Sequence, residues 1–537
     1  MKAISRRDFL AGLNAAALTA AAAGRQVCLG AKADAASAEH KRPPNIIYYV
    51  ADELAYFELS CMGHPDYRTP NIDRMATEGM RFAQCLAGSA VCAPTRCCLL
   101  TGKHSGHASV RNNGTHQTLQ EGEATLGSML KAAGYATGGF GKWGNGNRGS
   151  AGVPEKHGFD VFFGYYDQSH AHSYYPPYLI RNSKEVPQRG NEPGLQLTGQ
   201  TYSHYEIVRE SKRWIRENRN RPFFAYLAWT PPHGSFAIPE DEPSWQLYRD
   251  KPWPHDAKVY AAMVNMIDRH FGEIFEMVKQ LGLDNNTIVM LSGDNGGYNY
   301  FADQDHPAGF FGPNVNPTTG QRFRAAKGSI YEGGLRVPFI ARWPGHIKPG
   351  QVSNHLCYFP DVMPTLAEAA GTQCPEGIDG ISFLPTLVGG AEAGHKQVQH
   401  EFLYWEFQAM TAVRIGSWKG VQPKKTVPWE LYDLSNDIEE KSDVAGEHPE
   451  IIERMKTIAM KEHMSQPTTG VFDRVLNAKD LQSVYPGKDS TGADPGADEK
   501  RGKGAKPDAG EQALGRSPEG CGKKLPTGAG LNAGIGE

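Results

Sequence analysis

Short apolar runs rich in β-forming residues alternate with helical patterns along most of this chain. Three of these runs span residues 45–50, 222–229 and 287–291. The helical patterns between and around them span residues 71–79, 125–133, 204–217 and 255–281. Parallel strands need a crossover connection that is usually a helix, so this alternation predicts a mostly parallel sheet covered by helices.

Polar residues follow each of the three runs at the point where the run ends. Asp52 and Glu53 follow the first, His233 follows the second, and Asp294 and Asn295 follow the third. Ligands of open α/β sheets bind outside the carboxyl ends of the strands. We therefore expect these side chains to meet in one site at that edge of the sheet.

The change in sequence pattern along the chain predicts a large domain followed by a smaller one. At 537 residues the chain is long enough for an α/β domain over 43–387 with a companion. Residues 388–470 predict an antiparallel β subdomain with a helix, from strands at 402–405, 412–419 and 430–434 and a helix at 449–464. From residue 478 to 537 glycine, proline, lysine and aspartate dominate, which predicts a disordered tail.

The first 35 residues are typical of a twin-arginine export signal. Arg6 and Arg7 precede an alanine-rich run over 13–23 that is too short to span a bilayer, which needs about 20 apolar residues. We expect the twin-arginine translocase as a partner, a periplasmic or secreted location, and no stable membrane span. The cleavage bond, after Ala33 or Ala35, stays open.

Bulk charge and cysteine spacing exclude some classes of protein. The net charge is -3 and the charged residues are interspersed, which argues against a nucleic-acid-binding protein. The nine cysteines have no regular spacing, so no disulfide framework can be inferred.

One short motif carries the most specific chemical information. Residues Cys92-Ala93-Pro94-Thr95-Arg96 spell C-x-P-S/T-R, and Leu100-Thr101-Gly102 follow. The motif resembles the modification site of the sulfatase family, the formylglycine-dependent type I sulfatases of the alkaline phosphatase superfamily. Blocks at 69–75, 292–296 and 327–338 also resemble blocks of that arylsulfatase-like family in the family's order, over roughly residues 43–465.

The resemblance implies a nucleophile, a metal and a fold. A formylglycine-generating enzyme would oxidise Cys92 to formylglycine (3-oxoalanine), whose hydrate is the nucleophile. A calcium ion, with Mg²⁺ as second choice, would bind Asp52, Glu53, Asp294, Asn295 and the modified Cys92, and hard oxygen ligands suit either cation. The implied fold is a large mixed, mostly parallel sheet sandwiched by helices, as in alkaline phosphatase.

The resemblance also implies roles for four further side chains. Arg96 would hold the formylglycine, Lys142 would contact the hydrate and the sulfate, and Lys327 would hold sulfate beside the leaving oxygen. His233 would assist departure of the alcohol as a general acid. Taken singly, either lysine reads equally well as a solvated side chain, and the histidine as a loop cap.

Two positions depart from the family pattern. Glu53 stands where aspartate is usual, and its extra methylene demands a shifted backbone or a different coordination. Gly144 stands where the family often has a histidine that acts as a base. We hypothesise that His172, or as second choice His170, takes over this role. The alternative is that both histidines bind substrate or structure a loop.

The predicted activity is hydrolysis of sulfate esters, on sulfated polysaccharides or oligosaccharides. The aromatic residues at 165–166, 174–178 and 245 stack on sugars or pack within loops. Competing functions are a phosphodiesterase or phosphonate monoester hydrolase of the same fold, and a non-catalytic sulfoglycan-binding protein. The sugar, the sulfate position, endo or exo action and the oligomeric state are not predicted by the sequence.

Overall fold

The computed structural model describes residues 42–114, 117–298, 300, 314–466 and 473–487. The predicted signal peptide and residues 488–537 of the predicted tail lie outside the described residues. Within the described ranges, no helix combines the length and the hydropathy needed to cross a membrane.

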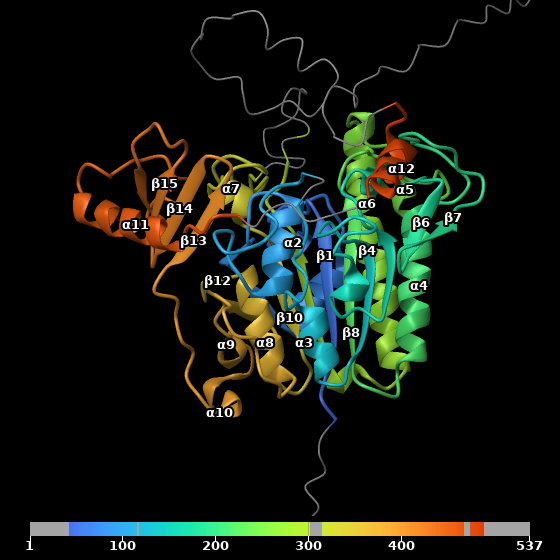
Figure 1. Ribbon diagram of the computed structural model, residues 1–537, viewed down its shortest axis with the longest axis horizontal. Helices are drawn as coiled ribbons and strands as arrows, with labels where there is room; N and C mark the ends of the chain where they lie inside the picture. Colours follow the sequence, from blue (N-terminus) through green and yellow to red (C-terminus); the bar gives the residue numbers. More distant parts are fainter. Residues whose placement is uncertain (1–41, 115–116, 299, 301–313, 467–472, 488–537) are drawn as a thin grey trace, which may run out of the picture. The chain divides into compact units, whose positions relative to one another are not determined.

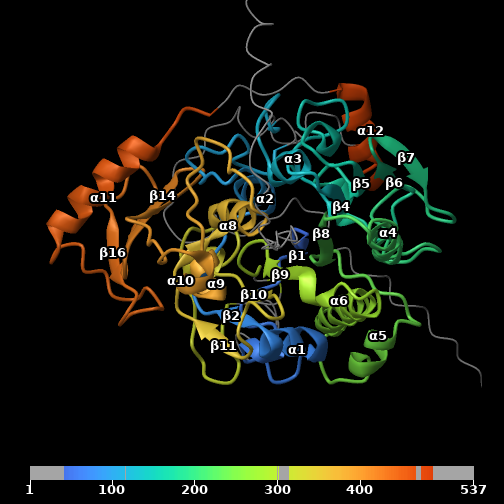
Figure 2. The ribbon, with the colours of Figure 1, turned by 90° about the horizontal axis from the view of Figure 1, so that it is seen from below.

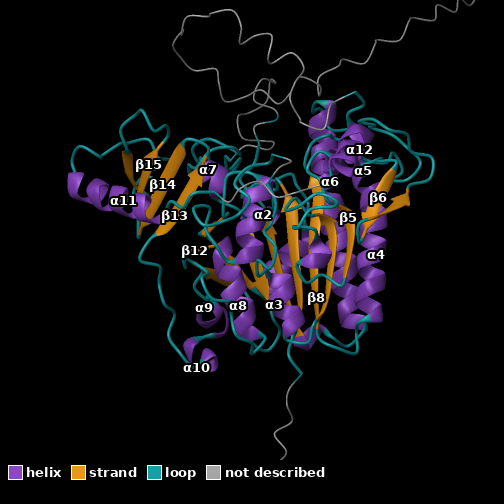
Figure 3. Cartoon of the chain, viewed as in Figure 1, coloured by secondary structure: helices purple, strands orange, loops and turns teal. Residues whose placement is uncertain are grey.

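A ten-stranded sheet forms the centre of the fold (Figure 3). Its strands are β1 (Asn45–Asp52), β2 (Met80–Phe82), β4 (Ala136–Lys142), β5 (Val161–Tyr165), β6 (Tyr178–Arg181), β7 (Lys184–Pro187), β8 (Phe223–Pro232), β9 (Thr287–Gly293), β10 (Phe339–Arg342) and β11 (Gln351–Ser353). The strand order is β11-β2-β10-β9-β1-β8-β4-β5-β6-β7. The five central strands, from β9 to β5, are parallel, which confirms the predicted fold class.

Helices cover both faces of this sheet (Figure 2). One face carries α1 (Pro70–Glu78), α4 (Ser203–Glu217), α5 (Pro243–Tyr248) and α6 (His255–Gln280); the other carries α2 (Cys92–Thr101), α3 (Leu126–Ala132) and α8 (Val362–Ala369). In β1, Ile47 and Tyr49 join the core on the α6 face, while Ile46 and Tyr48 join the core on the α2 face. Because both faces are covered, the strand is apolar throughout rather than alternating.

A second, four-stranded antiparallel sheet follows the large sheet in the chain. It consists of β13 (Leu403–Phe407), β14 (Met410–Ile415), β15 (Trp418–Gln422) and β16 (Glu430–Asp433), and α11 (Pro449–Glu462) packs on β14. The single strand predicted over 412–419 is wrong. It is the hairpin of β14 and β15, because Gly416, at φ 60°, allows a two-residue turn between them.

The chain forms a helix where the sequence predicts the start of a disordered tail. The helix α12 (Arg474–Val484) contradicts that prediction for residues 478–484. Asp473 caps its first turn, and Asp480 accepts two hydrogen bonds from Arg148, at 2.6 and 2.9 Å. The composition of the segment concealed these contacts because their partners lie far away in the sequence.

Short elements complete the described chain. They are β3 (Cys85–Leu86), β12 (Cys357–Tyr358), α7 (Glu332–Leu335), α9 (Leu384–Val388), α10 (Gly390–Ala393) and the 3₁₀ turns η1 (Ser60–Met62), η2 (Pro154–Lys156), η3 (His170–His172), η4 (Asp284–Asn286) and η5 (Phe359–Asp361). The seven described cysteines are all free thiols.

Tyrosines 165, 166, 174, 175 and 178 are buried, so of the two roles considered for these rings the structure favours loop packing over sugar stacking.

Candidate functional site

The polar residues predicted at the strand exits do meet at one edge of the sheet. Asp52 ends β1, His233 follows β8 and Asp294 follows β9, while Cys92 is the first residue of α2. The strands β1 and β8 and the helix α2 are labelled in Figure 1. Pro94 fits the first turn of that helix because the amide it lacks has no intrahelical partner there. The first turn also presents positive backbone dipoles, which favours binding of an anion beside residue 92.

Cys92 lies at the centre of a buried network of charged groups. Its thiol donates to Asp52 Oδ1 at 3.1 Å, and Lys142 Nζ donates to Asp52 Oδ2 at 2.6 Å. Arg96, one turn after Cys92, donates to Asp294 Oδ2 at 2.9 Å and to the carbonyl of Lys142 at 3.0 Å. All five side chains are 1 % exposed or less.

Burial and neighbouring charges set the pKa values in this network. Burial alone would raise the pKa of Asp52, but Lys142 and the other cations outweigh it and hold the pKa well below its usual value. Burial and the adjacent carboxylate of Asp52 raise the pKa of Asp294 to about 7. Burial, then Asp294 and Asp52, raise the pKa of the Cys92 thiol. Two carboxylates held this close create a site where a cation would be stabilised.

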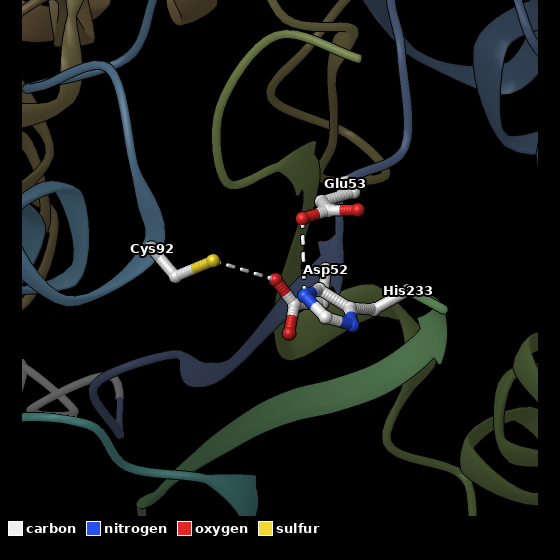
Figure 4. A group of neighbouring side chains, drawn as sticks. All are labelled: Asp52, Glu53, Cys92 and His233. Atoms are coloured by element: carbon white, nitrogen blue, oxygen red, sulfur yellow. Dashed lines mark hydrogen bonds and ion pairs between the residues drawn. The ribbon is translucent and has the colours of Figure 1, made fainter. Parts of the chain in front are cut away.

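The carboxylate of Glu53 contacts a second group of side chains in the site. Its backbone is left-handed, with φ 63°, and its amide donates to Asp294 Oδ1 at 3.0 Å. The carboxylate lies 3.0 Å from His233 Nε2 (Figure 4). It also contacts Lys327 and Tyr300. The departure at position 53 therefore has a structural counterpart, because the longer side chain reaches the predicted acid and the predicted lysine.

Two side chains of this second group have their own electrostatics. Burial lowers the pKa of His233, although Asp52 opposes the shift. Burial also lowers the pKa of Lys327 to about 8, again opposed by Asp52. Lys327 Nζ lies 3.5 Å from His233 Nε2, so the lysine predicted to hold sulfate and the predicted general acid are neighbours.

The donor set fits a hard divalent cation. Four ligand atoms lie within 4.8 Å of one another, one each from Asp52, Glu53, Cys92 and His233. Asn295 is fully buried; its amide nitrogen donates to Gly296 while Oδ1 has no hydrogen-bond partner in the described part of the protein. A buried amide oxygen beside carboxylates is a ligand type that Ca²⁺ and Mg²⁺ prefer.

Gln168, which sequence reasoning missed, occupies the space beside Gly144. A Cβ atom at position 144 would lie 2.0 Å from Gln168 Nε2 and 3.8 Å from Arg96 Cδ. Gln168 is 9 % exposed, and neither its Nε2 nor its Oε1 has a hydrogen-bond partner among the described residues. The only signal in the sequence was Gly144 itself, since a missing side chain leaves room for another.

The two candidate substitute bases lie in different surroundings. His170 Nε2 donates to the carbonyl of Tyr178 at 3.1 Å and its ring packs against Tyr165. His172 stacks on His233, with ring centroids 5.0 Å apart, and its Nδ1 lies 2.9 Å from the hydroxyl of Tyr485. The structure thus brings His172 next to another predicted site residue, and Tyr485, directly after α12, is a second neighbour that sequence reasoning missed.

A second histidine cluster lies where the chain after α2 meets α11. His104 Nε2 lies 3.3 Å from Glu462, and His107 Nδ1 lies 2.9 Å from Asp379. The amide of Gly106 donates to His104 Nδ1, which places the proton of a neutral ring on Nε2. This tautomer donates to Glu462 and leaves no lone pair for a metal, so the cluster reads as a hydrogen-bonded junction.

Comparison with known families identifies two matching regions. A family model described as Sulfatase matches residues 44–372, and one described as N-sulphoglucosamine sulphohydrolase, C-terminal, matches residues 323–466. N-acetylgalactosamine-6-sulfatase of Mus musculus is 30% identical over 454 residues, 79% of this chain and 79% of that protein. Arylsulfatase A of Homo sapiens is 30% identical over 475 residues, 78% of this chain and 87% of that protein.

Solved structures show the same architecture. The crystal structure of Ps i-CgsB in complex with k-i-k-neocarrahexaose superposes with a TM-score of 0.66 at 25% sequence identity. The match covers 82% of this chain and 98% of that one.

Proposed function

Because this chain belongs to the sulfatase family and is a sulfuric ester hydrolase, we propose that its substrates are sulfated saccharides. We also propose that residue 92 acts as formylglycine, formed by a formylglycine-generating enzyme, beside a bound calcium ion. The observation that carries the proposal is the contact of Cys92, at the start of α2, with the buried Asp52, which itself holds Lys142.

The formylglycine and the cation would supply complementary chemistry. The hydrated aldehyde would offer one hydroxyl as a nucleophile toward sulfur and a second hydroxyl whose deprotonation frees the sulfate. The cation, held by Asp52, Asp294, Asn295 and Glu53, would neutralise negative charge on the oxygens bound to it.

The protein's own cations bind and orient the sulfate. Lys142 and Arg96 are fixed in place by Asp52 and Asp294, so they need no reorganisation when negative charge develops. Lys327 lies at the outer side of the site, where its amine meets the carboxylate of Glu53. A sulfate placed between these inner and outer cations has its ester oxygen directed toward His233.

Proton transfer divides between two histidines in this proposal. His233 gives a proton to the departing alcohol, with Lys327 3.5 Å from its Nε2. His172, which stacks on His233, remains the proposed base, with His170 as second choice. Gln168 cannot take up a proton, so its role is to donate and accept hydrogen bonds at the space beside Gly144.

A saccharide substrate is supported by what related proteins bind or act on. The names of two similar proteins refer to N-acetylgalactosamine-6-sulfate hydrolysis and to a complex with a neocarrahexaose. The export signal predicted for residues 1–35 agrees with a periplasmic or secreted enzyme that meets such glycans outside the cytoplasm. Sequencing of the amino terminus of the exported protein tests that location.

The direct test is a mass spectrum of the peptide that contains Cys92, from protein made in its native host. We expect the mass loss of thiol-to-aldehyde conversion, and release of sulfate from an aryl sulfate by the same preparation. The variant Cys92→Ala is the control for background turnover. An active preparation whose residue 92 is wholly thiol would refute the formylglycine mechanism, and a preference for phosphate or phosphonate esters would refute the substrate class.

A further inference from the structure

A cavity of about 900 Å³ lies where the segment directly after β2 meets the four-stranded sheet. None of the residues proposed for the sulfatase site lines it. Its volume falls within the range of small-molecule sites. It is therefore a separate recess, and its lining has an unusual composition.

The lining carries positive and amide groups but no carboxylate. Two arginines and two histidines contribute to it, together with five carboxamide side chains, and neither aspartate nor glutamate does. The carboxamides are Gln84, Gln321, Asn354, Gln397 and Gln399. Carboxamides donate and accept at once, which matches the neighbouring hydroxyl groups of a sugar.

Arg414, on β14, is a cation in the lining of the cavity. Its side chain is buried, at 4 % exposure of the residue. Nε donates to the carbonyl of Gly416 at 3.0 Å and Nη2 donates to Gln84 at 2.6 Å, but Nη1 has no partner in the described chain. No carboxylate of the described residues forms an ion pair with it, although buried charges are normally paired.

The cations next to the cavity differ in whether they have a direct counter-ion. Arg336 and Lys419 both contact Glu332, and Lys419 also contacts Glu440. Arg414, by contrast, has no carboxylate within ion-pair distance among the described residues. Burial lowers the pKa of Arg414 to about 10, with Glu332 opposing the shift, as expected of a guanidinium without a direct counter-ion. An anion in the cavity would supply the missing charge.

The rim offers what a saccharide needs beyond its anionic group. Tyr56 and Phe402 are partly exposed aromatic rings in the lining, and Asn354, Gln321 and Gln399 are exposed amides. Aromatic faces pack against apolar faces of sugar rings while amides meet the hydroxyls.

We infer that this cavity is a second binding site for a sulfated saccharide, in which Arg414 receives a sulfate group and the carboxamides bind sugar hydroxyls. The ligand class rests on the proposed function, and the site would hold a unit of a sulfated chain other than the one being hydrolysed.

The test uses the full chain carrying Cys92→Ala, so that no probe is consumed. The probes are a sulfated hexasaccharide, the same hexasaccharide without sulfate, and inorganic sulfate. Hydrogen exchange locates binding, with peptides over 396–403 and 412–419 reporting the cavity and peptides over 92–101 reporting the sulfatase site. Calorimetry gives the affinities.

We expect the sulfated hexasaccharide to protect the cavity peptides. Arg414→Gln and Gln399→Glu should each weaken that binding by about tenfold or more, by losing or opposing positive charge. Gln399 is exposed, so its variant folds even where Arg414→Gln does not. Gln280→Glu, an exposed change at the end of α6 outside the cavity, should leave the affinity unchanged.

Three results would overturn the inference: protection confined to residues 92–101, equal protection by the unsulfated hexasaccharide, or equal protection by inorganic sulfate alone. A failure of the proposed function is seen separately, as absence of sulfate release by the parent protein. Binding at the cavity peptides would stand in that case.

Discussion

Gln168→Met should separate stability from activity. The substitution keeps the length of the side chain and removes both polar atoms, neither of which has a hydrogen-bond partner among the described residues. Burying an unpartnered polar group costs about 1–3 kcal/mol in proteins. The free enzyme should therefore unfold at the same free energy or up to about 3 kcal/mol higher, whereas most buried substitutions destabilise.

Activity should move in the opposite direction. If the amide binds a charged group at residue 92 or on the sulfate, the lost hydrogen bond is worth about 1.5–3 kcal/mol, which lowers kcat/KM by about 10- to 150-fold. The assay is aryl sulfate turnover on preparations with equal formylglycine content, beside chemical denaturation of each protein. Gln168→Glu serves as the matched polar control. A Met variant that is less stable and fully active would refute the reasoning, because it would make the amide a packing group.

Three further predictions concern pH, the C-terminal helix and the metal. Burial lowers the pKa of His270 from 6.5 to about 3, so as the pH falls this group is protonated in the unfolded chain before it is protonated in the folded protein. Lowering the pH from 7 to 4 should therefore reduce the free energy of unfolding by about 3 kcal/mol through this group, and His270→Leu should remove that slope in acid denaturation curves. Asp480→Ala removes two of the three side-chain hydrogen bonds of the buried Arg148 guanidinium and leaves the one to Glu185. It should weaken docking of α12 by about 3 kcal/mol, seen as faster tryptic cleavage at Lys479; unchanged cleavage would contradict this docking. Chelation of divalent cations should abolish turnover and lower the thermal midpoint, because the neighbouring carboxylates of Asp52 and Asp294 would lose the cation proposed to bind them both, and Ca²⁺ should restore both properties.

The sequence predicted the parts of the fold that depend on local pattern. β1 is apolar on both faces and ends in Asp52, so its burial and its exit were readable from the run alone. Cys92 and Arg96 were found through a motif that places both on one face of α2, one turn apart. These features can be predicted from the sequence because each depends on residues that are neighbours in the chain.

What the sequence concealed depends on contacts between distant segments. Gln168 fills space beside Gly144 because β4 and β5 lie side by side, which no periodicity encodes. The docking of α12 depends on Asp480 and Arg148, which are 332 residues apart. Glu53 reaches Lys327 and His233 only because its backbone is left-handed, a conformation rare outside glycine.

Because Cys92 is buried, the oxidation proposed for it depends on when the chain folds. The thiol is 1 % exposed, and the neighbouring Arg96 is held by Asp294, which the ribosome adds 198 residues later. The proposed modifying enzyme must bind the segment around residue 92, so it can act only after that segment is synthesised and before the chain folds. The fraction of active molecules is then set by the rate of modification of residue 92 relative to the rate of folding. Overproduction in a host with little of the modifying enzyme should then yield well-folded protein without sulfatase activity. Such protein could be modified only after it unfolds.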